Sequence, residues 1–132
     1  MPPTTPLRTL RAVIVDDDEL FAESLTALLA GEEGIDVVGW ASNGVDGVDL
    51  VEAEQPDVVV MDLAMPQMGG VEAAKIIGRI APDTRIILLS GSLLGEELER
   101  IAGKTGADAY VTKARVAIDL LPALRPDAER PS

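Results

Sequence analysis

Acidic residues directly follow two apolar runs of this sequence. Asp16 and Asp17 come after Ala12–Val15, and Asp62 comes after Val58–Met61. If the three carboxylates converge, each close pair repels by about 4 kcal/mol at a separation of about 4 Å and an effective dielectric constant of about 20. Such a cluster needs protons, a lysine or a divalent cation to neutralise it. The chain has no histidine and no cysteine, so oxygen ligands would select Mg²⁺, Ca²⁺ or Mn²⁺. A few carboxylates together with waters suit Mg²⁺ best.

A hydroxyl group and a lysine follow two further apolar runs. Ser90 comes after Arg85–Leu89, and Lys113 follows Ala109–Thr112. Mg²⁺, a carboxylate, a hydroxyl and an ammonium group together are typical of phosphoryl transfer. The positive charges neutralise the phosphoryl oxygens while the carboxylate attacks and becomes an aspartyl phosphate. We expect Ser90 to donate a hydrogen bond to a phosphoryl oxygen and Gly91 to leave space for that group. Taken alone, Ser90 is equally well explained as an ordinary hydroxyl at the end of a strand. Lys113, taken alone, is equally well explained as a solvated charge.

Alternating strands and helices are predicted to position these residues. Five short apolar runs, each predicted to be a strand, are Ala12–Val15, Ile35–Ala41, Val58–Met61, Arg85–Leu89 and Ala109–Thr112. Helical spacing between and after them predicts helices at about 19–30, 44–54, 71–80, 94–104 and 115–124. This alternation predicts an α/β fold with a parallel sheet covered on both faces. Ligands of open α/β sheets bind beyond the carboxyl ends of the strands, and all the candidate residues fall at that edge.

The first predicted helix has its own signals. Asp18 is interpreted as its N-cap, which is the commoner role of an isolated aspartate at a strand end. Gly31 is interpreted as its end. Helical spacing is expected to place on one face Leu20, Ser24, Leu25, Leu28 and Leu29.

Composition limits the class of protein. The 132 residues fit one compact domain, and 11 basic against 23 acidic residues give a formal charge of −12, which argues against a nucleic-acid surface or an anionic membrane. Zinc sites, disulfides and Ser/His or Cys/His catalytic pairs are excluded. No apolar run approaches the roughly 18 residues of a membrane span, and residues 1–9 lack a signal-peptide pattern, so we expect a cytoplasmic protein. We expect a folded domain at 10–124 between flexible tails at 1–9 and 125–132.

Together these motifs resemble the receiver domain of two-component response regulators, over about Arg11–Leu124. The segments that carry the resemblance are Val13–Asp17, Pro56–Pro66 with Gly69 and Gly70, Ile86–Ser90, and Gly106–Lys113. The resemblance implies a flavodoxin-like, doubly wound (βα)5 fold whose five-stranded parallel sheet has the order 2-1-3-4-5. Met65–Ser90 and Gly106–Lys113 resemble the subfamily whose members usually end in a LuxR-type helix-turn-helix. No such DNA-binding domain is found in these residues.

The resemblance implies a role for each candidate residue. Asp62 would accept a phosphoryl group from the phosphohistidine of a sensor histidine kinase, and Lys113 would contact that group. Asp17 would bind Mg²⁺ directly and Asp16 mostly through water, with Asp62 and the backbone carbonyl of Ala64 as the other protein ligands. The implied activity is self-catalysed phosphotransfer and autodephosphorylation, which leaves open whether the chain turns over as an enzyme.

The resemblance also implies a switch and partners. Ser90 would move toward the phosphoryl group, and Tyr110 would swing inward after it, which changes the surface of the fourth helix, fifth strand and fifth helix. Tyr110 is alternatively an ordinary half-buried residue at a strand end. Arg125–Ser132 resembles the start of an interdomain linker. We therefore expect a piece of a longer protein with a C-terminal effector domain in transcription regulation, and the resemblance allows a homodimer.

Some positions depart from the family pattern. Ala114 stands where proline is common, often with a cis peptide bond. Since a cis bond without proline costs about 2.5–4 kcal/mol, the Lys113–Ala114 bond is left open between cis and trans. Pro122 is expected to shorten or kink the last helix. Trp40, on the second strand at the expected edge of the sheet, is expected to pack against a helix.

Two other functions fit part of the sequence. A haloacid-dehalogenase-type Mg²⁺-dependent phosphatase would use Asp16–Leu20 as its nucleophile motif, with Ser90 and Lys113 in later motifs. That class needs a further acidic pair after the lysine and does not account for Asp62 followed by a Met-Pro pair. A degenerate receiver acting only as an interaction module is the other alternative, and the presence of every key residue argues against it.

Overall fold

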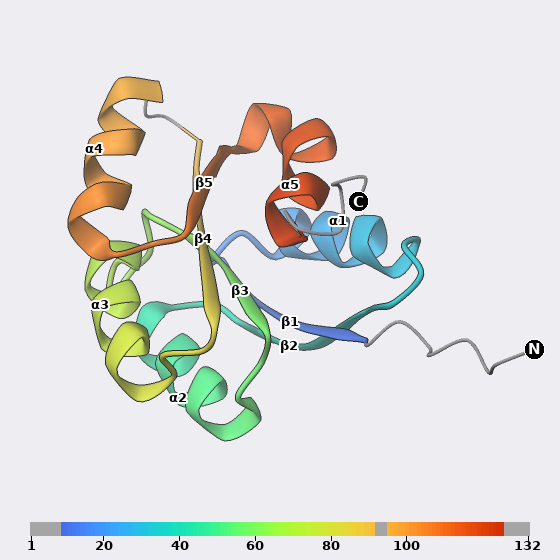
Figure 1. Cartoon of the computed structure of the whole chain (residues 1–132), viewed down its shortest axis with the longest axis horizontal. Helices are drawn as coiled ribbons and strands as arrows, with labels where there is room; N and C mark the ends of the chain where they lie inside the picture. Colours follow the sequence, from blue (N-terminus) through green and yellow to red (C-terminus); the bar gives the residue numbers. More distant parts are fainter. Residues whose placement is uncertain (1–8, 92–94, 126–132) are drawn as a thin grey trace, which may run out of the picture.

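The computed structural model describes residues 9–91 and 95–125 (Figure 1). Its strands are β1 (Leu10–Val15), β2 (Ile35–Ala41), β3 (Val58–Asp62), β4 (Arg85–Ser90) and β5 (Ala109–Thr112). Its α-helices are α1 (Glu19–Ala30), α2 (Gly44–Glu54), α3 (Gly70–Ile80), α4 (Gly95–Thr105) and α5 (Val116–Leu124). The strands pair in parallel in the order β2-β1-β3-β4-β5. The predicted α/β, flavodoxin-like fold and its strand order are therefore confirmed.

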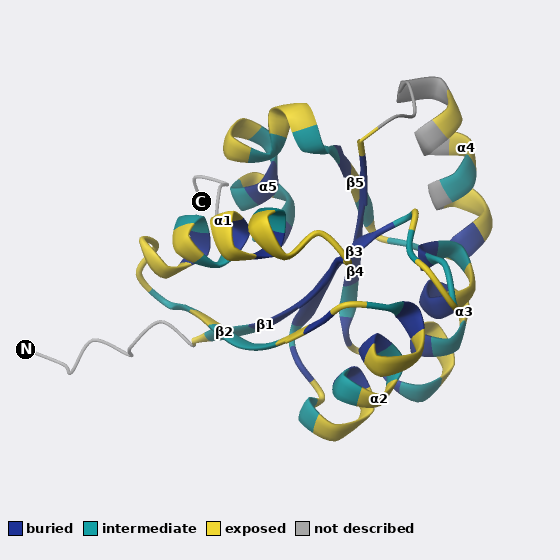
Figure 2. Cartoon of the chain, turned by 180° about the vertical axis from the view of Figure 1, so that it is seen from behind, coloured by how far each residue is buried: buried dark blue, intermediate teal, exposed yellow. Residues whose placement is uncertain are grey.

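Two hydrophobic cores lie on opposite faces of this sheet. Alternate residues of the strands point to opposite faces, so Val13 and Met61 join the core under α2 and α3, whereas Ile14 and Val60 join the core under α1 and α5. Every residue of β3 is buried, as predicted for a strand that is apolar on both sides. Figure 2 shows the buried strands at the centre and exposed positions on the outer faces of the helices. The helices on both faces make the sheet doubly wound.

Within residues 9–91 and 95–125, no helix is both long enough and apolar enough to cross a membrane.

Element boundaries differ from the predicted ones by one or two residues. β1 begins at Leu10, two residues before its expected start. A short 3₁₀ helix follows β5, so α5 begins at Val116 rather than at Arg115. Pro122 lies inside α5, which with 9 residues is the shortest α-helix described, as expected of a proline in that position. The expected start of the fourth helix at Leu94 lies outside the described residues, as do residues 1–8 and 126–132 of the two expected tails.

The predicted face of α1 is partly wrong. Leu25 and Leu29 are buried as the spacing indicates. Leu20, however, is 76% exposed, and Ser24 is exposed as well. Ala22 is buried instead, because the inward positions follow the spacing i, i+3 and i+7 from residue 22. The helix is therefore rotated relative to the expected face, and its first turn presents an apolar side chain to solvent.

Candidate functional site

Four strands bring candidate residues to one edge of the sheet. Asp16 follows β1, Asp62 ends β3, Ser90 ends β4 and Lys113 follows β5. Because the strands are parallel, these four ends lie at the same edge (Figure 1). Asp16 is fully buried, and Asp62 and Ser90 are only 5% and 3% exposed. The edge therefore holds charged and polar groups that water hardly reaches.

Three carboxylates lie together at this edge. One oxygen from each of Asp16, Asp17 and Asp62 lies within 4.8 Å of the other two, and of the three only Asp17 is exposed. Oδ1 of Asp16 accepts a hydrogen bond from the backbone N–H of Asp18 at 2.8 Å. Asp18 in turn caps α1, as predicted, by accepting a hydrogen bond from the N–H of Phe21 at 3.1 Å. The turn between β1 and α1 is thus fixed by side chains that flank the cluster.

Lys113 reaches across the cluster. Its Nζ lies 2.9 Å from Oδ2 of Asp16 and 3.4 Å from Oδ2 of Asp62. The same Nζ lies 4.4 Å from the centroid of the Phe21 ring, within the range of a cation–π interaction. The peptide bond between Lys113 and Ala114 is trans. Two carboxylates and one aromatic ring therefore hold the ammonium group.

Burial and charge shift the pKa values of two of these groups. Burial raises the pKa of the Asp62 carboxyl above its ordinary value, and the charge of Asp16 raises it further, against the opposing effect of Lys113. Burial by itself lowers the pKa of Lys113, but the contact with Asp16 and the charge of Asp62 outweigh it, so that this pKa is raised. Asp62 is thus costly to ionise here even with the lysine beside it.

The donor set fits a hard divalent cation. Oδ2 of Asp16 is buried and accepts no hydrogen bond from the described residues, although the Nζ of Lys113 lies 2.9 Å away. In the part of the chain that the structure describes, Lys113 is the one cation paired with this cluster of three carboxylates, so a further positive charge would relieve their repulsion. Clustered carboxylate oxygens are typical ligands of Mg²⁺ and Ca²⁺.

A cavity of about 270 Å³ lies beside the Asp62 carboxylate. The loop after β3, the end of β4 and Ile101 of α4 form its walls, which include Ala64 and Ser90. The N–H of Ala64 donates a hydrogen bond to Oδ1 of Asp62 at 3.4 Å. Among the described residues, a Cβ at Gly91 would meet only the Lys113 side chain, at an ordinary 3.7 Å, so the space expected there would also accommodate alanine. The cavity gives a small anionic group access to Asp62.

Two aromatic side chains, those of Phe21 and Trp40, contact residues of this site. Tyr110, expected as a switch, lies on β5 and is 38% exposed. Phe21 was not predicted to contribute, and the only sequence signal for it is an aromatic residue in the first turn after an acidic pair. Trp40 was expected only to pack against a helix. Its indole N–H donates a hydrogen bond to the backbone carbonyl of Asp16 at 2.9 Å, so it also braces the residue that carries the buried carboxylate.

A family model of the response regulator receiver domain matches residues 12–125. The chain belongs to this family. The receiver domain is 35% identical over 116 residues to the transcriptional regulatory protein LiaR of Bacillus subtilis, a match that covers 88% of this chain and 54% of LiaR. It is 39% identical over 116 residues to the transcriptional regulatory protein PdtaR of Mycobacterium tuberculosis, which covers 86% of this chain and 54% of PdtaR. The chain thus spans about half the length of these curated relatives.

Solved structures show the same likeness. The response regulator domain of CheB from Thermotoga maritima is similar with a TM-score of 0.83 and 29% identity, over 95% of this chain and all of that one (100%). A LuxR-family two-component response regulator from Aurantimonas sp. SI85-9A1 is similar with a TM-score of 0.83 and 31% identity, over 89% of this chain and 84% of that one. These matches do not favour the alternatives of a haloacid-dehalogenase-type phosphatase or a pure interaction module.

Replacing Phe21 with leucine is expected to weaken the binding of beryllofluoride, a phosphoryl mimic, to this receiver domain. Leucine retains apolar volume but removes the aromatic face on which the Lys113 ammonium rests. A cation–π interaction of about 0.7 kcal/mol corresponds to a loss of affinity of about three-fold. Fluorine NMR titration in the presence of Mg²⁺ measures this affinity. Phe21→Tyr, which keeps the ring, is the control that should match the wild type. Equal affinity of the leucine variant and the wild type would show that the ring does not hold the lysine.

Proposed function

We propose that this chain is the phosphoacceptor receiver domain of a two-component response regulator and that Asp62 is its site of phosphorylation. The observation that carries this proposal is the position of Asp62. Its carboxylate lies among Asp16, Asp17 and Lys113 and borders an open cavity. A sensor histidine kinase would be the donor: a carboxylate oxygen of Asp62 attacks phosphorus, the bond from phosphorus to the histidine nitrogen breaks, and the imidazole leaves.

Mg²⁺ is the cofactor that this proposal assigns to the carboxylate cluster. Asp17 and Asp62 would bind it directly and Asp16 mostly through water, with the backbone carbonyl of Ala64 as a further ligand. When bound, the ion supplies positive charge against the oxygens of the transferring group. One oxygen from each of Asp16, Asp17 and Asp62 lies within 4.8 Å of the other two, which supports a cation shared by the three carboxylates.

Lys113 and Ser90 would complete the site. Lys113, which neighbours both Asp16 and Asp62, would exchange its contact with Asp62 for one with a phosphoryl oxygen. Ser90, which borders the same cavity as Asp62, would donate a hydrogen bond to another phosphoryl oxygen. In this proposal, Lys113 and Ser90 bind phosphorylated Asp62 more strongly than the unmodified carboxylate. That difference in binding free energy would drive a conformational change.

The change would reach the surface formed by α4, β5 and α5. Tyr110, which is partly exposed on β5, would swing inward as Ser90 moves toward the phosphoryl group. Because the chain spans about half the length of its curated relatives, an effector domain that acts in transcription regulation is proposed for the remainder. A cytoplasmic location, a homodimer and tails at residues 1–9 and 125–132 belong to the same proposal.

Treatment with a small phosphodonor tests this function. Acetyl phosphate with Mg²⁺ is expected to add one phosphoryl group per chain, seen as a mass increase, and the group should be lost slowly when the donor is removed. The same treatment with EDTA in place of Mg²⁺ should add none. Peptide mapping after borohydride reduction would locate the modified aspartate. A group found elsewhere than at Asp62, or labelling that does not depend on Mg²⁺, would refute the proposal.

A further inference from the structure

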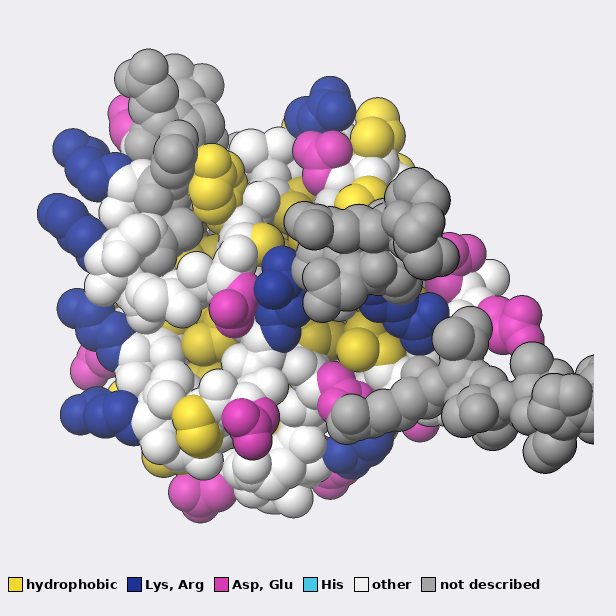
Figure 3. All heavy atoms as spheres, viewed as in Figure 1, with side chains coloured by type: hydrophobic (Ala, Val, Ile, Leu, Met, Phe, Trp, Pro, Cys, Tyr) yellow, Lys and Arg dark blue, Asp and Glu magenta, His cyan; other side chains and the backbone are white. Residues whose placement is uncertain are grey.

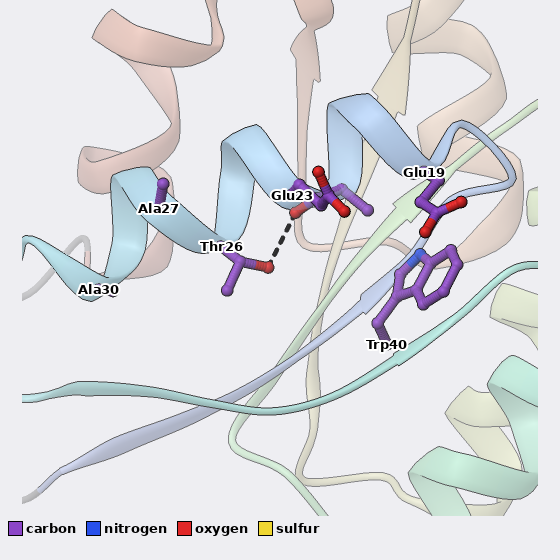
Figure 4. Close-up of a pocket in the computed structure, with 7 residues that line it drawn as sticks. Glu19, Glu23, Thr26, Ala27, Ala30 and Trp40 are labelled. Atoms are coloured by element: carbon purple, nitrogen blue, oxygen red, sulfur yellow. Dashed lines mark hydrogen bonds between the residues drawn. The ribbon is translucent and has the colours of Figure 1, made fainter.

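A groove runs between α1 and the edge strand β2, on a part of the surface that the proposed function does not use. It has a volume of about 360 Å³ and is lined by one face of α1, from Glu19 to Ala30, and by Trp40 of β2 (Figure 4). Eleven rises of about 1.5 Å from Glu19 to Ala30 make the groove roughly 16 Å long. That length accommodates about five residues of an extended chain at about 3.3 Å per residue.

The walls of the groove are largely apolar, and one of them is an aromatic ring. Ala22, Ala27 and Ala30 keep the α1 wall shallow because their side chains are small. Trp40 forms the opposite wall and remains 42% exposed. Its hydrogen bond to the carbonyl of Asp16 fixes the indole, which therefore presents a rigid aromatic surface to an incoming group.

Negative charge borders this ring. Glu19 and Glu23 are exposed, lie one helical turn apart on α1 and both line the groove. Figure 4 shows the Glu19 carboxylate next to the indole and Glu23 one turn further along the helix. Like charges at i and i+4 destabilise a helix by about 0.2–0.5 kcal/mol. α1 contains no Lys or Arg, and no ion pair among the described residues involves either glutamate.

Basic side chains gather on another part of the molecule. Lys and Arg side chains form a row along the edge that α4 and α3 make (Figure 3). The basic residues on these two helices are Lys75, Arg79, Arg100 and Lys104. The groove thus combines an aromatic face and two carboxylates with no cation of its own, a combination that attracts a positively charged group.

We propose that this groove binds an extended basic segment of a partner protein, with an arginine side chain stacked on Trp40 and paired with Glu19 and Glu23. Arginine suits the site better than lysine, because its planar, weakly hydrated guanidinium group stacks on an indole and offers several donors to carboxylates. Apolar side chains next to the arginine would occupy the part of the groove lined by Ala27 and Ala30. Nucleic acid is disfavoured as the occupant, because its phosphates would face the two glutamates.

A peptide titration tests the proposal. The probe is a blocked pentapeptide, Ala-Leu-Arg-Leu-Ala, and its control is the same peptide with uncharged citrulline in place of arginine. Trp40 is the only tryptophan of the chain, so its fluorescence reports on the groove directly. The arginine peptide is expected to change the emission saturably. Citrulline should weaken binding at least about ten-fold, since it loses both the charge pairing and the cation–π contact.

Matched variants distinguish binding at this groove from non-specific electrostatic attraction of the peptide to an acidic protein. The double variant Glu19→Gln, Glu23→Gln is expected to bind the arginine peptide with about ten-fold lower affinity. Asp49→Asn with Glu52→Gln removes two exposed charges from α2 and should leave the affinity unchanged. Circular dichroism checks that each variant folds.

Four results would overturn the proposal. They are the absence of saturable binding, equal affinity for the citrulline peptide, equal weakening by the two double variants, and Trp40 emission that depends on protein concentration without peptide. The last of these would assign the groove to a second copy of the chain.

Discussion

Replacing Asp62 with asparagine is expected to abolish the Mg²⁺-dependent modification of this receiver domain by acetyl phosphate. Asparagine has nearly the same shape as aspartate, so the packing at the end of β3 is kept. It lacks the negative oxygen that would attack phosphorus. The phosphorylated fraction, measured by mass spectrometry of the intact protein, should fall to the background found with EDTA.

Two companion variants make this result specific. Asp83→Asn changes an exposed aspartate of the turn between α3 and β4 and should be labelled like the wild type. Asp16→Asn removes a proposed metal ligand and should slow labelling without moving its position. Labelling of Asp62→Asn at the wild-type level, together with loss in Asp16→Asn, would instead assign the nucleophile to β1, as in the phosphatase alternative.

Replacing Gly70 with alanine is expected to destabilise the domain strongly. A Cβ at Gly70 would lie 2.4 Å from the carbonyl oxygen of Asp62 and 2.8 Å from the Cα of Leu63, both of them backbone atoms that cannot turn aside. The N–H of Gly70 also donates a hydrogen bond to the carbonyl of Leu63 at 3.0 Å, so the first turn of α3 is held against the end of β3. Overpacking of this kind costs about 3 kcal/mol. The melting temperature should fall by about 10 °C.

Gly78 of the same helix provides the matched control. It is exposed, and a Cβ there would meet no atom of the described residues within 4 Å. Since glycine is a poorer helix former than alanine, Gly78→Ala should stabilise the domain by about 0.5–1 kcal/mol. The two substitutions add the same methyl group and are expected to act in opposite directions. A fall in melting temperature of less than about 2 °C for Gly70→Ala would contradict the close approach of α3 to Asp62.

The fold and the gathering of the polar residues could be predicted because both depend on local patterns. The run Val58–Met61 of β3 is apolar on both sides and is therefore expected to be buried. The parallel topology places the residue at the end of each strand at the same edge of the sheet. The placement of Asp16, Asp62 and Lys113 at the same edge of the sheet follows from that topology alone. Their distances and their burial do not, because they depend on how the connecting loops are packed.

The parts that could not be predicted are contacts between side chains from distant segments. Helical spacing does not fix the rotation of α1 to within one position, so Leu20 was expected beside Leu25 and is instead exposed. That rotation also decides that Phe21 meets Lys113, which lies far along the chain. Likewise, the hydrogen bond from Trp40 to the backbone of Asp16 has no signature in the sequence, because any carbonyl can accept it.

The dependence of stability on pH follows from the buried carboxylate. Without Mg²⁺, the pKa of Asp62 is raised above its ordinary value of 3.8, so its protonated form is favoured by folding. The contribution of the Asp62 carboxyl to the free energy of unfolding is fully present at a pH below 3.8. This contribution is lost as the pH rises through the raised pKa of the folded state. Mg²⁺ binds the ionised carboxylates, so its stabilising effect should grow over the same pH range.

The most direct test of the account is the melting temperature of the domain as Mg²⁺ is added near neutral pH. At a concentration ten times its dissociation constant, a ligand bound only by the folded state stabilises it by about 1.4 kcal/mol. We expect a rise of about 5 °C for the wild type at that concentration. Asp17→Ala should show none, and Asp49→Asn should behave like the wild type. A melting temperature that does not change with Mg²⁺, or one that rises equally in Asp17→Ala, would contradict a metal site formed by these three carboxylates.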